Sequence, residues 1–217
     1  MLLAAAAAGA MLYTQFCSSC HGTDLRGGVN APSIRGVGAA GVDFWVGTGR
    51  MPAAVPWLEE GHRATQFTQN QIDALTAYVS SVAPGGRPIP RIDATGDAPR
   101  GRKLYEQNCV HCHGVYAEGA SIGSNEWAPS LHAASIVQVA EAIRIGPGQM
   151  PAFGEKQLDE REMKDVVKYV WSLNDETAQQ AMPLRSSGPV PEGLFGWLAV
   201  ALLSVFAFAY SRGANGR

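Results

Sequence analysis

The sequence has few charged residues and few cysteines for its length. Among its 217 residues, Asp, Glu, Lys and Arg account for 17%, and the formal net charge is -2. Such a balance offers no basic surface for nucleic acid, so we expect no nucleic-acid partner. The four cysteines form two C-x-x-C pairs with none left over, which excludes a large disulfide framework and indicates chemistry at specific sites.

Convincing alternation of apolar and polar residues, the pattern of half-buried strands, is also absent from the sequence. Apolar residues instead recur at helical spacing, for example in "LDEREMKDVVKYVWSL" (158–173). The 25 Gly and 13 Pro residues provide turns and loops between such segments. We therefore predict an all-α fold with long connecting loops.

The chain contains an internal repeat, which is the first feature to settle in any fold assignment. "GAMLYTQFCSSCHG" (9–22) aligns without a gap on "GRKLYEQNCVHCHG" (101–114), and a Gly-x-Gly-x-Met-Pro-Ala segment recurs later in both halves. The same order of segments in both halves predicts a duplicated domain. The predicted boundaries are a first copy at 1–88, a Gly- and Pro-rich linker at 89–99 and a second copy at 100–182.

Both aligned segments contain C-x-x-C-H. A zinc ribbon places its two C-x-x-C pairs roughly 15–20 residues apart, whereas these pairs lie about 90 apart, and a redox dithiol does not need the following His. C-x-x-C-H is the signature of c-type haem attachment. We predict two covalently bound haem c groups, with His21 and His113 as proximal iron ligands. The predicted thioether bonds come from Cys17, Cys20, Cys109 and Cys112.

Met51 and Met150 occupy equivalent places in the repeated Gly-x-Met-Pro-Ala segment. They follow the first cysteine of their motifs by 34 and 41 residues, which is far enough for a loop to reach the opposite side of a haem ring. The proline after each Met fixes φ and restrains the loop. We predict that both thioether sulfurs are sixth iron ligands. His62 and His132 are weaker alternatives, because neither has a counterpart in the other repeat.

The C-terminal segment "LFGWLAVALLSVFAFAY" (194–210) carries no charge. As a helix it would reach about 26 Å, close to the hydrocarbon thickness of a bilayer. The prediction for this end of the chain is a linker at 183–192, a transmembrane helix at 193–211 in contact with membrane lipid, and a tail at 212–217. Arg212 and Arg217 place the tail in the cytoplasm. The haem domains would then lie on the outer, periplasmic face of the cell membrane.

Each repeat resembles a class I cytochrome c domain in its C-x-x-C-H motif and its Met-Pro-Ala loop, over about residues 9–180. The resemblance implies a few helices wrapped around one haem. It also implies that the N-terminal helix crosses the C-terminal helix with Gly9 over Ala77–Tyr78 and with Gly101 over Lys168–Tyr169. It also implies that the Nδ1–H of the haem His donates to a backbone carbonyl, that of Pro32 in the first repeat and that of Pro129 in the second.

Two such domains followed by a C-terminal span resemble, more narrowly, the dihaem cytochrome cc subunit of actinobacterial cytochrome bcc complexes. The resemblance implies transfer of electrons from the Rieske iron–sulfur protein, beside the cytochrome b subunit, to the copper-bearing subunit of a terminal oxidase. Such a chain is an electron-transfer subunit of a quinol–cytochrome c reductase rather than a catalytic chain by itself. Two alternatives are the dihaem subunit of a cbb3-type oxidase and a c-haem enzyme such as a peroxidase or thiosulfate dehydrogenase.

Overall fold

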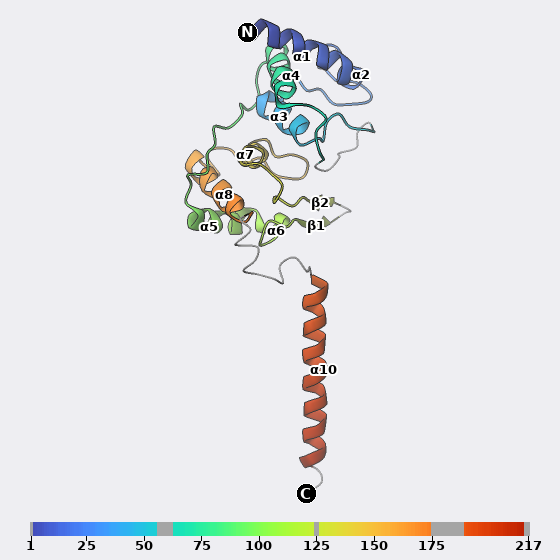
Figure 1. The fold of residues 1–217 in the computed structure, drawn as a ribbon, viewed down its shortest axis with the longest axis vertical. Helices are drawn as coiled ribbons and strands as arrows, with labels where there is room; N and C mark the ends of the chain where they lie inside the picture. The colour runs from blue at the N-terminus through green and yellow to red at the C-terminus, as the bar shows by residue number, and fades with distance from the viewer. Residues whose placement is uncertain (1, 56–62, 124–125, 175–188, 215–217) are drawn as a thin grey trace. The chain divides into compact units, whose positions relative to one another are not determined.

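The computed structural model describes residues 2–55, 63–123, 126–174 and 189–214. The chain divides into two units, Met1–Leu173, which holds both sequence repeats, and Asn174–Arg217 (Figure 1). The predicted end of the second copy at 182, most of the predicted 183–192 linker and residues 215–217 lie outside the described residues.

The first repeat is helical and has its own apolar core. Its helices, coloured blue to teal in Figure 1, are α1 (Leu2–Phe16), α2 (Ser18–His21), α3 (Gly38–Gly47) and α4 (Gln69–Val82). α1 packs across α4 at Gly9, where a Cβ atom would collide with the backbone oxygen of Ala74. The crossing expected at Gly9 is therefore confirmed, because only glycine lets the two backbones approach so closely.

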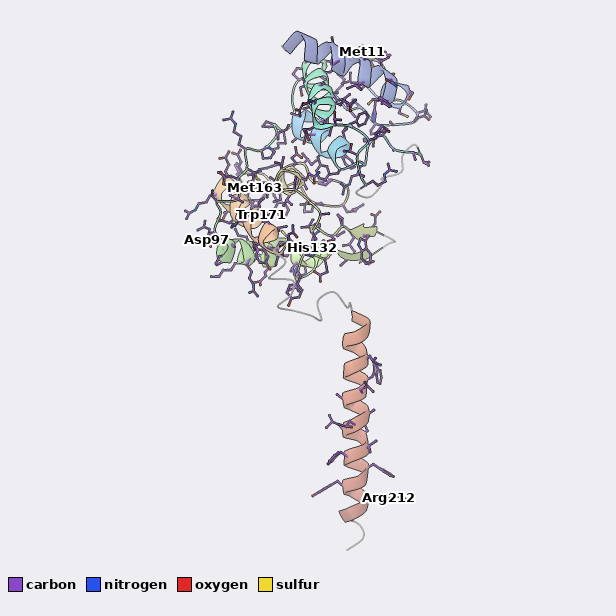
Figure 2. The ribbon with its side chains drawn as sticks, viewed as in Figure 1. Met11, Asp97, His132, Met163, Trp171 and Arg212 are labelled. Carbon is purple, nitrogen blue, oxygen red and sulfur yellow. The ribbon has the colours of Figure 1, made fainter. Side chains whose placement is uncertain are left out.

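The second repeat has the same helix order, with α5 (Ala98–Asn108), α6 (Val110–His113), α7 (Ile136–Ile145) and α8 (Glu160–Ser172). The crossing at Gly101 is confirmed, since a Cβ atom there would collide with the backbone oxygen of Asp165 on α8. Its partner lies about one turn before the predicted Lys168–Tyr169. The apolar stripe predicted for α8 forms the centre of a second core, in which Met163 (Figure 2) and Val167 are almost fully buried. Each repeat thus buries its apolar side chains around its own pair of crossing helices.

The prediction of an all-α fold is wrong in one place. A two-stranded antiparallel sheet, β1 (Ala120–Gly123) and β2 (Glu126–Ala128), lies between α6 and α7. The second repeat has 16 positions from its motif His to the following Pro, whereas the first has 11, and the sheet occupies this longer connection. Strands of four and three residues are too short to produce a detectable alternating pattern.

The prediction of a C-terminal transmembrane helix at 193–211 is wrong. The segment lies in α10 (Pro189–Ala214), but within the described part of the chain no helix combines the length and the apolar character needed to cross a bilayer. The apolar run from which the span was predicted covers only 17 residues, or about 26 Å, against a hydrocarbon core of about 30 Å. The expected lipid contact and the cytoplasmic tail at 212–217 depended on this span and lose their support.

The two repeats contact each other through α3 and α7, the helices that precede their Met-Pro-Ala segments. The connection between the repeats is also bonded to both of them. On the side of the first repeat, the N–H of Ala40 donates to the carbonyl of Arg87 (3.0 Å). On the side of the second, Lys164 pairs with Asp93 (3.0 Å). The connection from α4 to α5, residues 83–97, is therefore held to both repeats.

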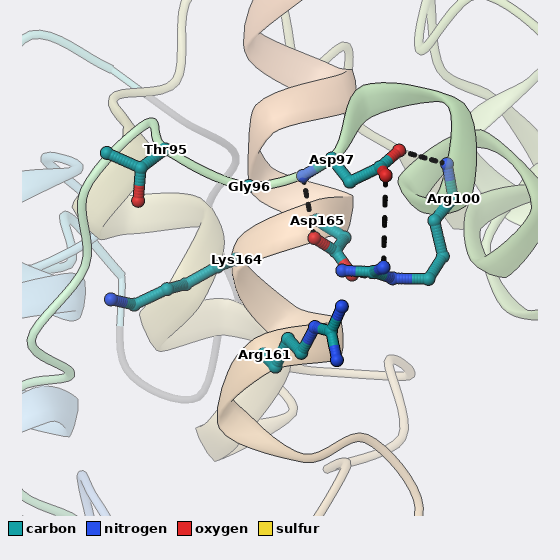
Figure 3. A pocket seen from close by; sticks show the side chains of 7 residues that line it. All are labelled: Thr95, Gly96, Asp97, Arg100, Arg161, Lys164 and Asp165. Carbon is teal, nitrogen blue, oxygen red and sulfur yellow. Dashed lines mark hydrogen bonds and ion pairs between the residues drawn. The ribbon is translucent and has the colours of Figure 1, made fainter.

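A cavity of about 320 Å³ lies between this connection and α8 (Figure 3). The N–H of Asp97 donates to the buried carboxylate of Asp165 (2.7 Å), which also accepts from the guanidinium of Arg100. Arg100 further donates its backbone N–H to Asp97 (2.9 Å). Because Arg100 pairs with both carboxylates, we interpret the cavity as a structural contact between the connection and α8.

Candidate functional site

The two C-x-x-C-H motifs are built in the same way. In the first repeat, the backbone N–H of Cys17 donates to the backbone carbonyl of Tyr13 near the end of α1 (2.9 Å). The N–H of His21 donates to the carbonyl of Cys17 (2.9 Å). In the second repeat, the N–H of Cys109 donates to the carbonyl of Tyr105 (2.8 Å), and the N–H of His113 donates to the carbonyl of Cys109 (2.9 Å). One helical turn therefore carries both cysteines and the histidine in each repeat.

Two buried tyrosines fix the chain where it leaves these motifs. The hydroxyl of Tyr13 donates to the carbonyl of Gly22 (2.6 Å), and the hydroxyl of Tyr105 donates to the carbonyl of Gly114 (2.8 Å). Burial, with the nearby Cys17 as a second cause, raises the pKa of Tyr13 to about 12, and burial raises the pKa of Tyr105 as well. Both hydroxyls thus remain donors over the physiological pH range. In the sequence these tyrosines served only to mark the repeat.

Each motif histidine is buried and oriented by a proline carbonyl. The Nδ1 of His21 lies 2.9 Å from the carbonyl oxygen of Pro32, and the Nδ1 of His113 lies 3.0 Å from that of Pro129. A carbonyl can only accept, so Nδ1 carries the proton and Nε2 keeps its lone pair for a metal. Burial lowers the pKa of His113, although the bond to Pro129 opposes the shift, and favours the neutral ring that ligation requires.

The loop after each motif repeats the same backbone conformation. Leu25 and Ala117 have positive φ values, 65° and 61°, although neither is glycine. In both loops a glycine N–H then donates to the motif histidine carbonyl at 2.8 Å, from Gly27 in the first repeat and Gly119 in the second. The two loops diverge only after this point, where the second repeat adds its hairpin. The hairpin therefore leaves the histidine and proline arrangement intact.

All four cysteines are free thiols in the structure. Burial raises the pKa of Cys17 to about 11 and that of Cys109 to about 12, with the second cysteine of each pair as a smaller cause. In the part of the chain that the structure describes, no group of three or more His, Cys, Asp or Glu side chains could hold a metal ion.

Each methionine packs against the same apolar cluster as the first cysteine of its own repeat. Met51 and Cys17 border the first core, and Met150 and Cys109 border the second. The N–H of Met51 donates to the carbonyl of Trp45 on α3 (2.9 Å). Within each repeat, the structure therefore places the methionine and the first cysteine of the motif against one apolar core. His132, one of the alternative ligands, lies in the loop after β2 (Figure 2).

Comparison with known proteins identifies the family. The Cytochrome c family model matches residues 6–83, and the model for Cytochrome C oxidase, cbb3-type, subunit III matches residues 96–170. The cytochrome bc1 complex cytochrome c subunit of Mycobacterium leprae is 34% identical, over 95% of this chain and 74% of its own length. The chain belongs to the family of cytochrome bc1 complex cytochrome c subunits.

Another member of this family and a member of a second family are also similar to the chain. The cytochrome bc1 complex cytochrome c subunit of Corynebacterium diphtheriae is 31% identical, over 92% of this chain and 77% of its own length. The cbb3-type cytochrome c oxidase subunit CcoP of Azospirillum sp. is 28% identical, over 78% of this chain and 62% of its own length. As a cytochrome c subunit, the chain transfers electrons and binds two covalently attached haem c groups.

The residues present fit these cofactors. Each repeat supplies two thiols and a histidine whose Nδ1 faces a carbonyl oxygen and whose Nε2 is available. The second repeat also contains an unsatisfied donor: Nη2 of the buried Arg144 has no hydrogen-bond partner among the described residues. A haem propionate is an acceptor of the kind that such a donor needs.

Three features of these sites escaped the sequence analysis. Arg63 and Arg144 donate to backbone carbonyls of the segments around the two methionines, and Glu141 is completely buried on α7 at the contact between the repeats. None belongs to a repeated motif. A charged residue within the apolar pattern of α7 was the only available signal for Glu141.

Proposed function

We propose that this chain carries electrons from the Rieske iron–sulfur protein of a quinol-oxidising bcc complex to the copper-bearing subunit of a terminal oxidase. The cytochrome b subunit would be its neighbour in the complex. Its relatives in Mycobacterium leprae and Corynebacterium diphtheriae are cytochrome c subunits of the cytochrome bc1 complex, which supports this assignment. The structural observation that carries it is the equal construction of the two repeats, each with the same donors in the same arrangement.

We assign the donors of each site as the sequence predicted. The thioether bonds come from Cys17, Cys20, Cys109 and Cys112. The iron ligands are His21 and Met51 in the first repeat and His113 and Met150 in the second. A haem iron with His and Met ligands supplies reversible one-electron transfer at a raised potential and has no open position for a substrate.

The remaining residues of each site hold these donors in place. The carbonyls of Pro32 and Pro129 fix the tautomer of the histidines and increase the basicity of Nε2. Tyr13 and Tyr105 hold the backbone directly after the motifs. Rigid surroundings favour fast electron transfer because little has to rearrange when the charge changes.

A dihaem subunit of a cbb3-type oxidase is the second candidate, since the second repeat matches the family model for subunit III of that oxidase. The two functions differ in the partners they require. A mass-spectrometric inventory of the native complex should find a Rieske protein and cytochrome b with this chain. Co-purification with a cbb3 catalytic subunit instead would favour the second candidate.

We also propose that both haem domains lie on the outer, periplasmic face of the cell membrane, as association with a quinol-oxidising complex would require. Protease added to intact spheroplasts should then reach this chain. Cleavage seen only after the membrane has been breached would place the domains on the other side.

Replacement of the two methionines tests the ligand assignment. Met51→Ala or Met150→Ala should remove the sulfur–iron charge-transfer band of one haem, lower its potential and admit carbon monoxide, because the sixth position is vacated. Met11→Ala is the matched control, since Met11 is exposed on α1 (Figure 2). A variant that keeps its sulfur–iron charge-transfer band shows that the substituted Met contributes only to packing and is not an iron ligand. Carbon monoxide binding by the unmodified protein would instead favour a c-haem enzyme such as a peroxidase or thiosulfate dehydrogenase.

A further inference from the structure

One arginine in the first repeat bonds to the backbone on both sides of Met51. The Nε–H of Arg63 donates to the carbonyl of Gly49 (3.2 Å), and its Nη2–H donates to the carbonyl of Pro52 (3.3 Å). Its backbone N–H also donates to the carbonyl of Thr48 (2.9 Å). A single residue thus holds the chain from three residues before Met51 to one residue after it.

The same segment is in close contact with the backbone of Arg63. Gly49 has a φ of 68°, and a Cβ atom there would collide with the carbonyl of Arg63. On the other side, the N–H of Met51 is bonded to the carbonyl of Trp45 at the end of α3. The backbone of Met51 is therefore fixed between α3 and the Arg63 segment.

A different arginine acts on the corresponding segment of the second repeat. Arg144 lies on α7 and is buried, with 7% of its surface exposed. Its Nη1 donates to the carbonyls of Phe153 (3.0 Å) and Leu158 (2.7 Å), and the N–H of Phe153 donates to the carbonyl of Ile143 (2.8 Å). These bonds tie the chain that follows Met150 to α7.

The two arginines are not equivalent in the repeat. When the Met-Pro-Ala segments are aligned, the place of Arg144 is taken in the first repeat by Trp45. The two repeats therefore restrain their methionine segments through unrelated positions, one after the Met and one before it. Restraint of the methionine segment is therefore a requirement of each site and was not simply inherited from the duplicated sequence.

We propose that Arg63 and Arg144 are positioning residues that hold Met51 and Met150, respectively, at their irons. The inference rests on the methionine ligation proposed above. Loss of the side-chain hydrogen bonds frees the segment to move its thioether away from the iron. Two hydrogen bonds of ordinary strength correspond to about a tenfold increase in the population with the Met detached. The increase should be larger at Arg144, because its loss leaves buried carbonyls unpaired.

The experiment uses the full-length protein with both haems attached and compares Arg63→Gln and Arg144→Gln with the unmodified chain. Ferric haem with a Met ligand binds cyanide only when the Met has left, so the apparent affinity reports the detached fraction. Arg63→Gln should increase the cyanide affinity of one haem about tenfold, and Arg144→Gln should increase that of the other haem by more than this. Each variant should weaken one sulfur–iron band and lower one potential.

Controls separate positioning from folding. Arg26→Gln is the matched control in the first repeat, because Arg26 pairs with Asp24 rather than with the methionine segment. Arg144→Lys retains one donor and should give an intermediate cyanide affinity, which loss of folding would not produce. Haem content and far-UV circular dichroism are measured for every variant.

The outcomes distinguish this inference from the ligand assignment on which it rests. If the unmodified protein shows the sulfur–iron band and both glutamine variants match it in cyanide affinity and potential, the positioning role is refuted while the ligation stands. If the unmodified protein lacks the band, the ligation fails and this inference fails with it. A selective change at one haem per variant supports both.

Discussion

The substitution Glu141→Gln should make the protein more stable at neutral and alkaline pH. Glu141 is 0% exposed on α7, and its carboxyl lies close enough to that of Asp43 for the two to share a hydrogen bond. Burial, followed by the charge of Asp43 on α3, raises its pKa to about 9. The carboxyl of Asp43 is itself half-buried, with a raised pKa, and accepts from Gln69 (3.4 Å). The contact between the repeats therefore contains two acidic groups that favour one shared proton.

Other charged groups do not offset this arrangement. Asp73 on α4 adds a second negative charge near Asp43 and contributes to the increase in its pKa. Arg144, one turn after Glu141, directs Nη1 to the carbonyls of Phe153 and Leu158. On α8, the buried Asp165 is bonded to Arg100. The neutral, protonated form of Glu141 is consequently the form that suits its site.

The size of this effect on the free energy of unfolding follows from the difference in proton binding between the folded and the unfolded chain. Between pH 4.5, the ordinary pKa, and about 9, the folded protein holds a proton that the unfolded chain has lost. The free energy of unfolding therefore falls as pH rises through this window, by at most about 1.4 kcal/mol per pH unit. From pH 5 to pH 7 the loss reaches about 2–3 kcal/mol, less any relaxation around the carboxylate. Gln cannot ionise and should remove this part of the slope.

The assay is denaturant unfolding of the haem-loaded protein at pH 5, 6, 7 and 8, followed by circular dichroism and by the haem absorbance. The difference between Glu141→Gln and the unmodified protein should grow with pH, because other titrating groups are common to both. Glu126→Gln is the control, since Glu126 is an exposed carboxylate on β2. A difference that stays constant from pH 5 to pH 8 would refute the reasoning.

Two further substitutions test the packing of the second repeat. Gly101→Ala places a Cβ atom against the backbone of α8 and should lower the free energy of unfolding by about 3 kcal/mol or more. Gly28→Ala is the control and should change stability little, because the nearest atom to its Cβ would lie at 3.9 Å. Equal effects of the two substitutions in denaturant unfolding would contradict the crossing. Asp159→Ala removes the side-chain acceptor for the N–H of Glu162 (2.8 Å) at the start of α8 and should lower the free energy of unfolding by about 1 kcal/mol. An unchanged unfolding midpoint would mean that this cap is not needed.

The parts of the site that repeat could be predicted from the sequence, and the parts that occur once could not. The equivalence of His21 and His113 identified the motifs, and family resemblance then gave the proline carbonyls and the crossing glycines. Arg63 and Arg144 have different places in the two repeats, so alignment of the repeats could not reveal them. Their role depends on which carbonyls the folded loops present, a property of tertiary structure.

The errors have equally specific causes. The hairpin of β1 and β2 has too few residues to give a periodic pattern. The predicted span at 193–211 was inferred from an apolar run at the lower limit of membrane-crossing length. The contact between α3 and α7 joins residues about 100 positions apart, and no local pattern in either helix specifies its partner.

The connection between the repeats has a consequence for how strong their contact must be. Because Ala40 is bonded to Arg87 and Lys164 to Asp93, the chain between the repeats keeps few of the conformations open to a flexible tether. Each repeat then experiences the other at a high effective concentration, and the entropy of bringing them together has already been lost on folding. A small contact between α3 and α7, which would not hold two separate proteins together, is sufficient here. Weak, tethered contacts of this kind can be adjusted by single substitutions without loss of the pairing.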